Sequence, residues 1–430
     1  MSMSNRLFSS NTMLEREQLW RDYQATRHVT EKICKPLEIE DYVIQTMPEA
    51  SPAKWHLAHV TWFFEAFLLK PYLTDYKEFN QGFHYIFNSY YQQLGVMHPR
   101  AKRGLLSRPT VADIYRYRAY VDEKMQILIE NIGEQPEIQK RIMIGLNHEQ
   151  QHQELFFTDI KYNLSVNPLY PVYRDDLAPA PQTNPNPNLQ QWHHFDSGMY
   201  QIGNNAQNEF IFDNEYPTHQ HYVDEFQLSS RLITNGEYIE FIEDKGYQRP
   251  EFWLSDGWAT VQQQQWQAPL YWQKRDDAWW CFTLSGLQPV DENAPVCHVS
   301  YFEADAYTTW ADARLATEFE WEVAAQSLPM EGNFYEADHL QPIPALDATH
   351  LQQMYGDVWE WTRSPYVAYP KYRPAKGAIG EYNGKFMCNQ FVLRGGSCVT
   401  SQNHIRLSYR NFFYPHERWQ FKGFRLAKDV

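Results

Sequence analysis

The sequence has little of what secreted, membrane-spanning or nucleic-acid-binding proteins depend on. It contains only five cysteines in 430 residues, without the close pairing of a structural metal site. No disulfide framework is therefore expected. The thiols are predicted to be mostly buried in the fold, and the protein is predicted to reside in a reducing compartment. The first residues lack the apolar segment of a signal peptide, and no run of about 18 apolar residues follows. These absences predict a soluble, cytoplasmic protein without a membrane partner.

Positive charge is also scarce. The chain has 38 Lys and Arg residues against 53 Asp and Glu residues, which gives a formal net charge of −15. This balance argues against a broad basic surface, so no nucleic-acid partner is expected. Aromatic residues, in contrast, make up 16% of the chain and predict aromatic packing or aromatic-lined pockets. A chain of this length predicts two domains.

Three histidines have the spacing of a metal site. His148 and His152 stand four residues apart in the run HEQQH, and His59 lies in an earlier helical pattern. Two side chains at this spacing share one helical face about 6 Å apart, so both imidazoles can reach one ion. His56 competes with His59 as the third ligand. The trio predicts a metalloenzyme with open coordination positions, but three imidazoles suit zinc as well as iron.

The first 165 residues contain four helical patterns. They cover residues 12–34, 51–69, 109–132 and 136–162. Four helices of this length predict a bundle whose inward-facing side chains form the metal site. The connection over residues 71–108 is long, and connections of that length are often functional.

The pattern changes in the second half of the chain. Residues 176–191 are rich in Pro and Asn and predict a linker between a domain at 1–175 and a domain at 192–430. Beyond the linker, short alternating apolar runs predict irregular strands, and amphipathic helices are expected at 234–244 and 301–311. The fold class predicted for the whole chain is α+β.

The motifs of both halves resemble known families. The first domain resembles the DinB-type four-helix bundle, and the second resembles the formylglycine-generating-enzyme (sulfatase-modifying-factor) fold, a C-type-lectin-like module. The second resemblance rests on PVCHVSYFEA at 295–304, RLATEFEWE at 314–322, GDVWEW at 356–361, RGGS at 394–397 and GFRL at 423–426. Joined in this order, the two domains resemble the iron-dependent sulfoxide synthases of ergothioneine biosynthesis over almost the whole chain.

The resemblance implies a metal, a reaction and a set of site residues. The metal is Fe(II), bound by His59, His148 and His152, because the ligand in this family follows Leu-Ala. The implied reaction is O₂-dependent carbon–sulfur bond formation between hercynine (N,N,N-trimethylhistidine) and a thiol, which leaves the sulfur as a sulfoxide. Tyr90 or Tyr91 is implied as the donor of a proton or hydrogen atom. The implied substrate-binding residues are Arg100, Arg103, Gln151, Asn411 and Phe413, with the second domain closing the active site.

Several alternatives stay open. Cysteine is the expected thiol, but γ-glutamylcysteine, histidine as the acceptor or a selenium donor fit the same scheme. HEQQH also matches the zinc-protease signature with Glu149 as the general base, although the extended form of that signature fails at Leu155 and Thr158. A metal-dependent thiol transferase of the plain DinB type and a non-catalytic binding module are the other candidates. Formylglycine generation is not expected, because only Cys398 follows the RGGS motif where those enzymes have a cysteine pair.

Overall fold

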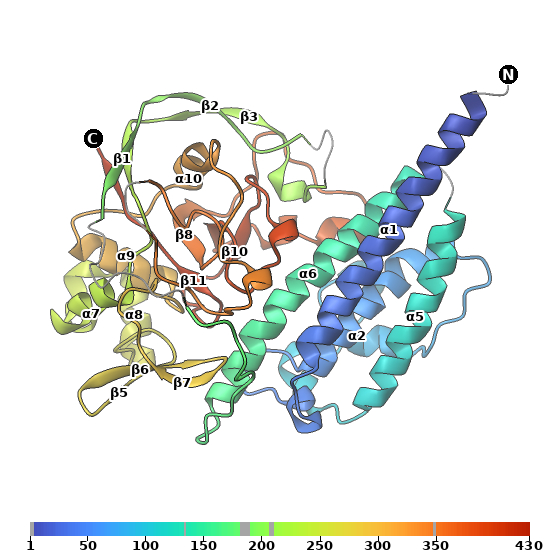
Figure 1. Cartoon of the computed structure of the whole chain (residues 1–430), viewed down its shortest axis with the longest axis horizontal. Coiled ribbons are helices and arrows are strands. Elements are labelled where there is room, and N and C mark those ends of the chain that lie inside the picture. The colour runs from blue at the N-terminus through green and yellow to red at the C-terminus, as the bar shows by residue number, and fades with distance from the viewer. Residues whose placement is uncertain (1–3, 133–134, 181–189, 206–209, 347–349) are drawn as a thin grey trace. The chain divides into compact units, whose positions relative to one another are not determined.

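The computed structural model describes residues 4–132, 135–180, 190–205, 210–346 and 350–430, with side chains described from Arg16 onward. Residues 181–189 of the predicted linker lie outside this described part. The chain divides into two compact units (Figure 1). Unit 1 comprises residues 1–166 with 377–379, and unit 2 comprises 167–376 with 380–430. The predicted domain limits at 175 and 192 stay predictions.

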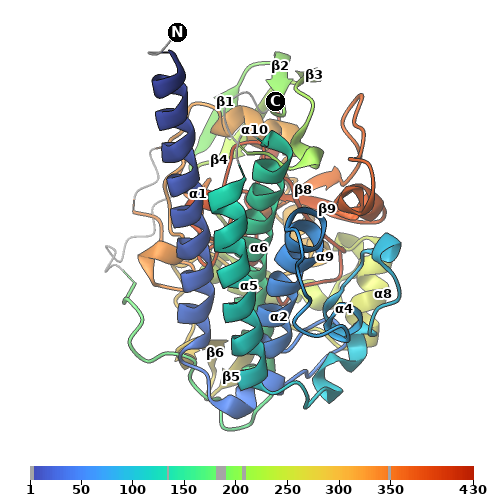
Figure 2. The same cartoon turned by 90° about the vertical axis from the view of Figure 1, so that its right-hand side faces the viewer.

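Unit 1 is built on four long helices. They are α1 (Ser4–Cys34), α2 (Ala53–Phe64), α5 (Val111–Asn131) and α6 (Pro136–Ser165). Helix α2 packs against α5 and α6, and α1 packs against the same two helices, as both views show (Figures 1 and 2). Every residue of α2 is buried, so this helix forms the centre of the unit.

The ends of these helices follow from local chemistry. Thr110 caps α5 in a reciprocal capping box with Asp113, and Pro136 occupies the first turn of α6, where its missing N–H costs nothing. The prediction that the first helix begins near residue 12 was wrong, because α1 begins at Ser4. Polar residues such as Asn and Thr are weak start signals, since an exposed helix tolerates them at small cost.

The long connection between α2 and α5 is partly helical. Helix α2 continues as a π-helical turn at Glu65–Leu69 and a short helix α3 (Lys70–Tyr72). Helix α4 (Phe83–Phe87) and 3₁₀ turns at Gln92–Leu94 and Arg100–Leu105 follow. The connection is therefore an ordered segment that places its side chains against α2.

Unit 2 mixes small sheets with short helices. Its helices are α7 (Asn235–Glu243), α8 (Ser255–Gln264), α9 (Tyr301–Trp310) and α10 (Glu318–Ala325). One sheet has the order β1-β4-β12 and comprises Trp192–Phe195, Phe226–Ser229 and Ala427–Asp429. A second has the order β10-β9-β8-β11 and comprises Asn411–Phe413, Phe391–Arg394, Trp359–Pro365 and Lys422–Gly423.

The remaining strands form two antiparallel units. The hairpin β2-β3 comprises Gly198–Ile202 and His219–Val223, and the meander β5-β6-β7 comprises Trp272–Arg275, Ala278–Thr283 and Gly286–Pro289. The predicted α+β class is confirmed by a helical unit 1 and a mixed unit 2. Within the described part of the chain, no helix has both the length and the apolar character required to span a bilayer.

Charged residues from several motifs of unit 2 meet in a buried network. Glu318 is 1% exposed and accepts hydrogen bonds from Arg410 at 2.8 and 2.9 Å and from Arg394 at 3.2 Å. Burial by itself raises the pKa of Glu318, but the charges of Arg410 and Arg394 outweigh it and hold the pKa below its ordinary value. A second carboxylate, Glu360, pairs with Arg425 and accepts from the indole of Trp321.

Replacement of Glu318 tests this network. In Glu318→Gln, two buried guanidinium groups lose their shared counter-charge, and we expect unfolding to become easier by about 3–5 kcal/mol in denaturant titrations. The matched control is Glu251→Gln, because the pair of Glu251 with Arg249 is exposed and screened by solvent, so that its loss should change stability little. Equal effects of the two substitutions would show that the buried network does not stabilise unit 2.

Candidate metal centre

Three histidine side chains of unit 1 converge on one point. His59 comes from α2, and His148 and His152 come from α6. One ligand atom from each lies within 4.8 Å of the others, and the Nε2 atoms of His59 and His148 are 3.2 Å apart. Two nitrogens that are each about 2.1 Å from one ion are separated by roughly 3.0–3.4 Å at ordinary coordination angles. The geometry of this trio therefore fits a single metal ion.

Hydrogen bonds orient two of the three imidazoles. The Nδ1 atom of His59 donates to the carbonyl oxygen of Phe87 at 2.6 Å, so its Nε2 lone pair is free for a metal. The Nδ1 atom of His152 lies 2.9 Å from Nδ1 of His56, whose Nε2 lies 3.0 Å from Asp159. With His56 donating to the carboxylate, its Nδ1 accepts the proton of His152 and leaves Nε2 of His152 for the metal.

This chain of hydrogen bonds gives His56 a different role from the one considered in the sequence. The Oδ2 atom of Asp159 also accepts the backbone N–H of Ser51 at 2.8 Å, so the carboxylate is held at the start of α2. His56 is 4% exposed and has both ring nitrogens in these bonds. These bonds suit a residue that positions His152 rather than a ligand.

The histidines are poised to bind metal without proton competition at neutral pH. Burial lowers the pKa of His148 to about 3. Burial also lowers the pKa of His59 and of His152 well below the ordinary value, and the neighbouring imidazole of His148 lowers both further. Neutral imidazoles keep their lone pairs, which a metal requires.

Glu149 faces away from the trio and anchors helix α6 to α1 and α5 through hydrogen bonds. Its carboxylate is fully buried and accepts from Arg27 at 2.8 Å, from Arg118 at 2.7 Å and from Thr30 at 2.7 Å. Burial by itself raises the pKa of Glu149, but the charges of Arg118 and Arg27 lower it to about 2. A carboxylate whose oxygens are held by two buried cations and a hydroxyl is not placed to act as a general base, which argues against a zinc protease.

The two tyrosines of the long connection differ in their surroundings. Tyr91 is fully buried and packs on Phe67 and Trp62 with ring centroids 4.9 and 5.8 Å away. Tyr90 is partly exposed, and its hydroxyl lies 3.4 Å from that of Tyr91. Reciprocal hydrogen bonds with the side chain of Asn88 hold the backbone of Tyr91. No sequence pattern predicts this role of Asn88, because the contact depends on the path of the loop.

The two arginines of the connection also differ in burial and in hydrogen bonding. Arg103 is 5% exposed, donates to the hydroxyl of Ser51 at 2.9 Å and lies over the ring of Trp55, 3.4 Å from its centroid. No acceptor among the described residues reaches its Nε atom. Arg100 is exposed, and its guanidinium donates to the carbonyl oxygen of Glu49. Of the two, only Arg103 is a buried cation whose hydrogen bonding is incomplete.

The other predicted site residues lie in different surroundings. Gln151 is a partly exposed residue of α6 next to His152. Asn411 and Phe413 belong to β10 of unit 2, where the ammonium group of Lys422 lies 4.3 Å from the ring centroid of Phe413.

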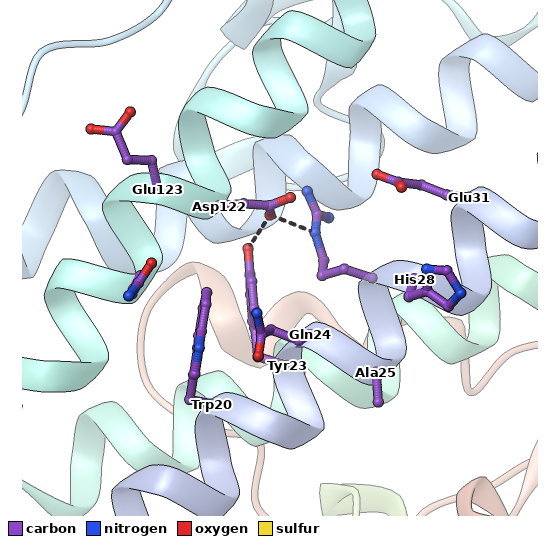
Figure 3. Close-up of a pocket in the computed structure, with 10 residues that line it drawn as sticks. Trp20, Tyr23, Gln24, Ala25, His28, Glu31, Asp122 and Glu123 are labelled. Atoms are coloured by element: carbon purple, nitrogen blue, oxygen red, sulfur yellow. Dashed lines mark hydrogen bonds and ion pairs between the residues drawn. The ribbon is translucent and has the colours of Figure 1, made fainter.

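A cleft of about 630 Å³ between α1 and α5 is separate from the trio (Figure 3). Asp122 on its wall accepts from Tyr23 at 2.6 Å and from Arg27 at 2.8 Å. None of the predicted ligands or substrate-binding residues lines this cleft, so it is not the metal centre.

Comparison with known proteins decides the family. The model of the "Sulfatase-modifying factor enzyme 1-like domain" matches residues 178–430. The hercynine oxygenase of Mycolicibacterium smegmatis is 30% identical, over 97% of this chain and 100% of that protein. The chain belongs to the hercynine oxygenase family.

Two further proteins named hercynine oxygenase are similar to this chain. The protein of Mycolicibacterium thermoresistibile is 29% identical over 89% of this chain and 88% of its own length. The protein of Mycobacterium tuberculosis is 36% identical over 51% of this chain and 56% of its own length. The resemblance inferred from the ordered motifs is thereby confirmed.

Variants of the trio and of its positioning residue test the metal centre of this hercynine oxygenase family member. His152→Ala removes a proposed ligand and should abolish stoichiometric metal binding. His56→Phe leaves the ligands in place but removes their orientation, so we expect metal affinity to fall by about 10–100-fold. Metal content and a binding titration measure both effects, with the exposed His28→Ala as control. Full metal binding by His152→Ala would contradict the proposed ligand set.

Proposed function

We propose that this chain is an O₂-dependent enzyme that joins hercynine to cysteine and forms a sulfoxide. In this reaction a ring C–H bond and an S–H bond are lost, one oxygen atom of O₂ ends on sulfur, and the other leaves as water. The trio of neutral imidazoles on α2 and α6 carries the proposal, because it offers a metal three nitrogens and leaves further positions open. Membership of the hercynine oxygenase family supports the choice of substrate.

Fe(II) is the proposed metal, held by His59, His148 and His152. Bound iron would supply the activation of O₂ and a point at which the thiol sulfur and the imidazole ring are aligned. Three uncharged ligands leave the site able to accept an anionic thiolate. The hydrogen bonds of His59 to Phe87 and of His152 to His56 hold the ligand rings in place before any substrate arrives.

Arg103 is proposed to bind the carboxylate of the amino-acid thiol. Its guanidinium is buried, and its Nε atom has no acceptor in the described part of the chain, so an incoming carboxylate would complete its hydrogen bonds. The contact with Trp55, a neighbour of His59, brings this cation to the same end of α2 as the metal centre. Arg100 is the proposed second, more exposed carboxylate contact.

The remaining substrate contacts are proposed on the family resemblance. Gln151 is suited to hydrogen-bond the imidazole of hercynine, because its side-chain amide both donates and accepts. Asn411 and Phe413 are the proposed contacts from unit 2. An aromatic ring such as that of Phe413 attracts a trimethylammonium group through cation–π interaction.

The proposed function is tested by reconstitution. The protein is loaded with Fe(II) without air, given hercynine and cysteine, and exposed to O₂, and the products are identified by mass spectrometry. We expect the sulfoxide conjugate and consumption of O₂. Cysteine sulfinate in its place would retain the iron–oxygen site but reject hercynine as the acceptor. If no O₂ is consumed and a zinc-loaded sample transfers thiols, the chain is a thiol transferase.

The two tyrosines are separated by matched variants. Tyr90→Phe should shift the products from sulfoxide toward sulfinate, because the phenol that gives a proton or hydrogen atom is lost. Tyr85→Phe, an exposed tyrosine of the same connection, serves as the control and should leave the product ratio unchanged. An unchanged ratio in Tyr90→Phe together with a shifted ratio in Tyr91→Phe would move the role to Tyr91.

A further inference from the structure

Two tryptophan rings enclose the proposed ligand His59. Trp55, His59 and Trp62 are four and three residues apart on α2 and so share one face of the helix. The ring of His59 is stacked on Trp55 at 4.5 Å and 11° and on Trp62 at 5.6 Å and 19°. Both indoles are buried, with 3% and 1% exposure. They are thus equivalent in burial and adjacent to the same ligand.

Their electrostatic surroundings are opposite. The guanidinium carbon of Arg103 lies 3.4 Å from the ring centroid of Trp55, and the indole N–H of Trp55 donates to the carbonyl oxygen of Ile86 at 3.0 Å. A positive charge over the ring opposes the loss of an electron from it. A peptide carbonyl accepts the hydrogen bond but does not take up the proton. Trp55 is therefore protected against oxidation.

Trp62 has the features that Trp55 lacks. Its indole N–H donates to Nδ1 of His84 at 3.2 Å, and Nε2 of His84 lies 2.7 Å from the carbonyl oxygen of Leu94. The carbonyl can only accept, so His84 carries its hydrogen on Nε2 and presents a basic lone pair at Nδ1. No lysine or arginine of the described residues lies over the ring of Trp62. An electron can leave this indole while its proton moves to an adjacent base.

We propose that Trp62 and His84 form a redox pair that supplies one electron to the metal centre. The step oxidises Trp62 by one electron and passes its Nε1 proton to Nδ1 of His84. The products are a neutral indolyl radical and an imidazolium that keeps its hydrogen bond to Leu94. The electron would go to a one-electron oxidant derived from O₂ or peroxide, which bound iron would supply when no thiol is available. The pair thereby diverts oxidation from the ligand His59, and this role rests on the proposed function.

The position of the modified tryptophan tests the pair. The full-length, iron-loaded protein is treated with hydrogen peroxide without thiol, and oxygenated tryptophan is quantified at both positions by peptide mass spectrometry. We expect several-fold more modification at Trp62 than at Trp55. His84→Phe should bring Trp62 down to the level of Trp55. Arg103→Met should raise modification at Trp55, because the charge above that ring is removed.

A matched histidine variant separates proton uptake from a general change in the loop. His98 lies in the same connection and has its Nε2 atom 3.1 Å from the carbonyl oxygen of Lys102, without a contact to Trp62. His98→Phe should leave the pattern unchanged. Rapidly frozen samples should also give the electron paramagnetic resonance signal of a neutral tryptophan radical, absent in Trp62→Phe.

Equal modification of Trp55 and Trp62, or a pattern unaffected by His84→Phe, would overturn the proposal. The sulfoxide assay on the same preparations keeps the two inferences apart. A normal sulfoxide yield with unselective oxidation rejects the redox pair alone. Selective oxidation of Trp62 without any sulfoxide rejects the proposed substrates and leaves the redox pair standing.

Discussion

The metal centre depends on one buried carboxylate. Glu149 lies between Arg27 of α1 and Arg118 of α5, and it directly follows the proposed ligand His148 on α6. An ion pair in this position gives little net stability, because desolvation of the charges offsets most of their attraction. Its effect is on geometry: α6 cannot rotate without separating its carboxylate from the two buried cations that hold it. The face of α6 that carries His148 and His152 is thereby held toward α2.

The site combines the ion pairs of Glu149 with three neutral candidate ligands. On one face of α6 the carboxylate of Glu149 is paired with Arg27 and Arg118, whereas on the other face burial keeps the imidazoles uncharged. The guanidinium of Arg103, over Trp55, has no acceptor for its Nε atom among the described residues. That contrast suits a centre that must attract an anionic substrate while it keeps its own ligands free of protons. The same cation makes the two tryptophans beside His59 chemically different.

Much of unit 1 could be predicted because its signals are local. The four-residue spacing of HEQQH places both histidines on one face in any α-helix, and the helical patterns of α2, α5 and α6 were recovered within a few residues. The helices predicted at 234–244 and 301–311 correspond to α7 and α9, whereas α8 and α10 of unit 2 were missed. Asn88 and His84 could not be found either, because their partners are reached only through the path of an irregular loop.

The sequence by itself determined the class of fold, the family and the candidate ligands, because helical spacing and motif order are properties of the chain alone. It left His56 and His59 as competitors, since both lie on nearby faces of one helix. Only the tertiary structure gives them different surroundings: Asp159 of α6 binds the ring of His56, whereas the carbonyl of Phe87 turns His59 toward His148. Such roles are set by contacts between residues far apart in the chain, and helical periodicity does not encode those contacts.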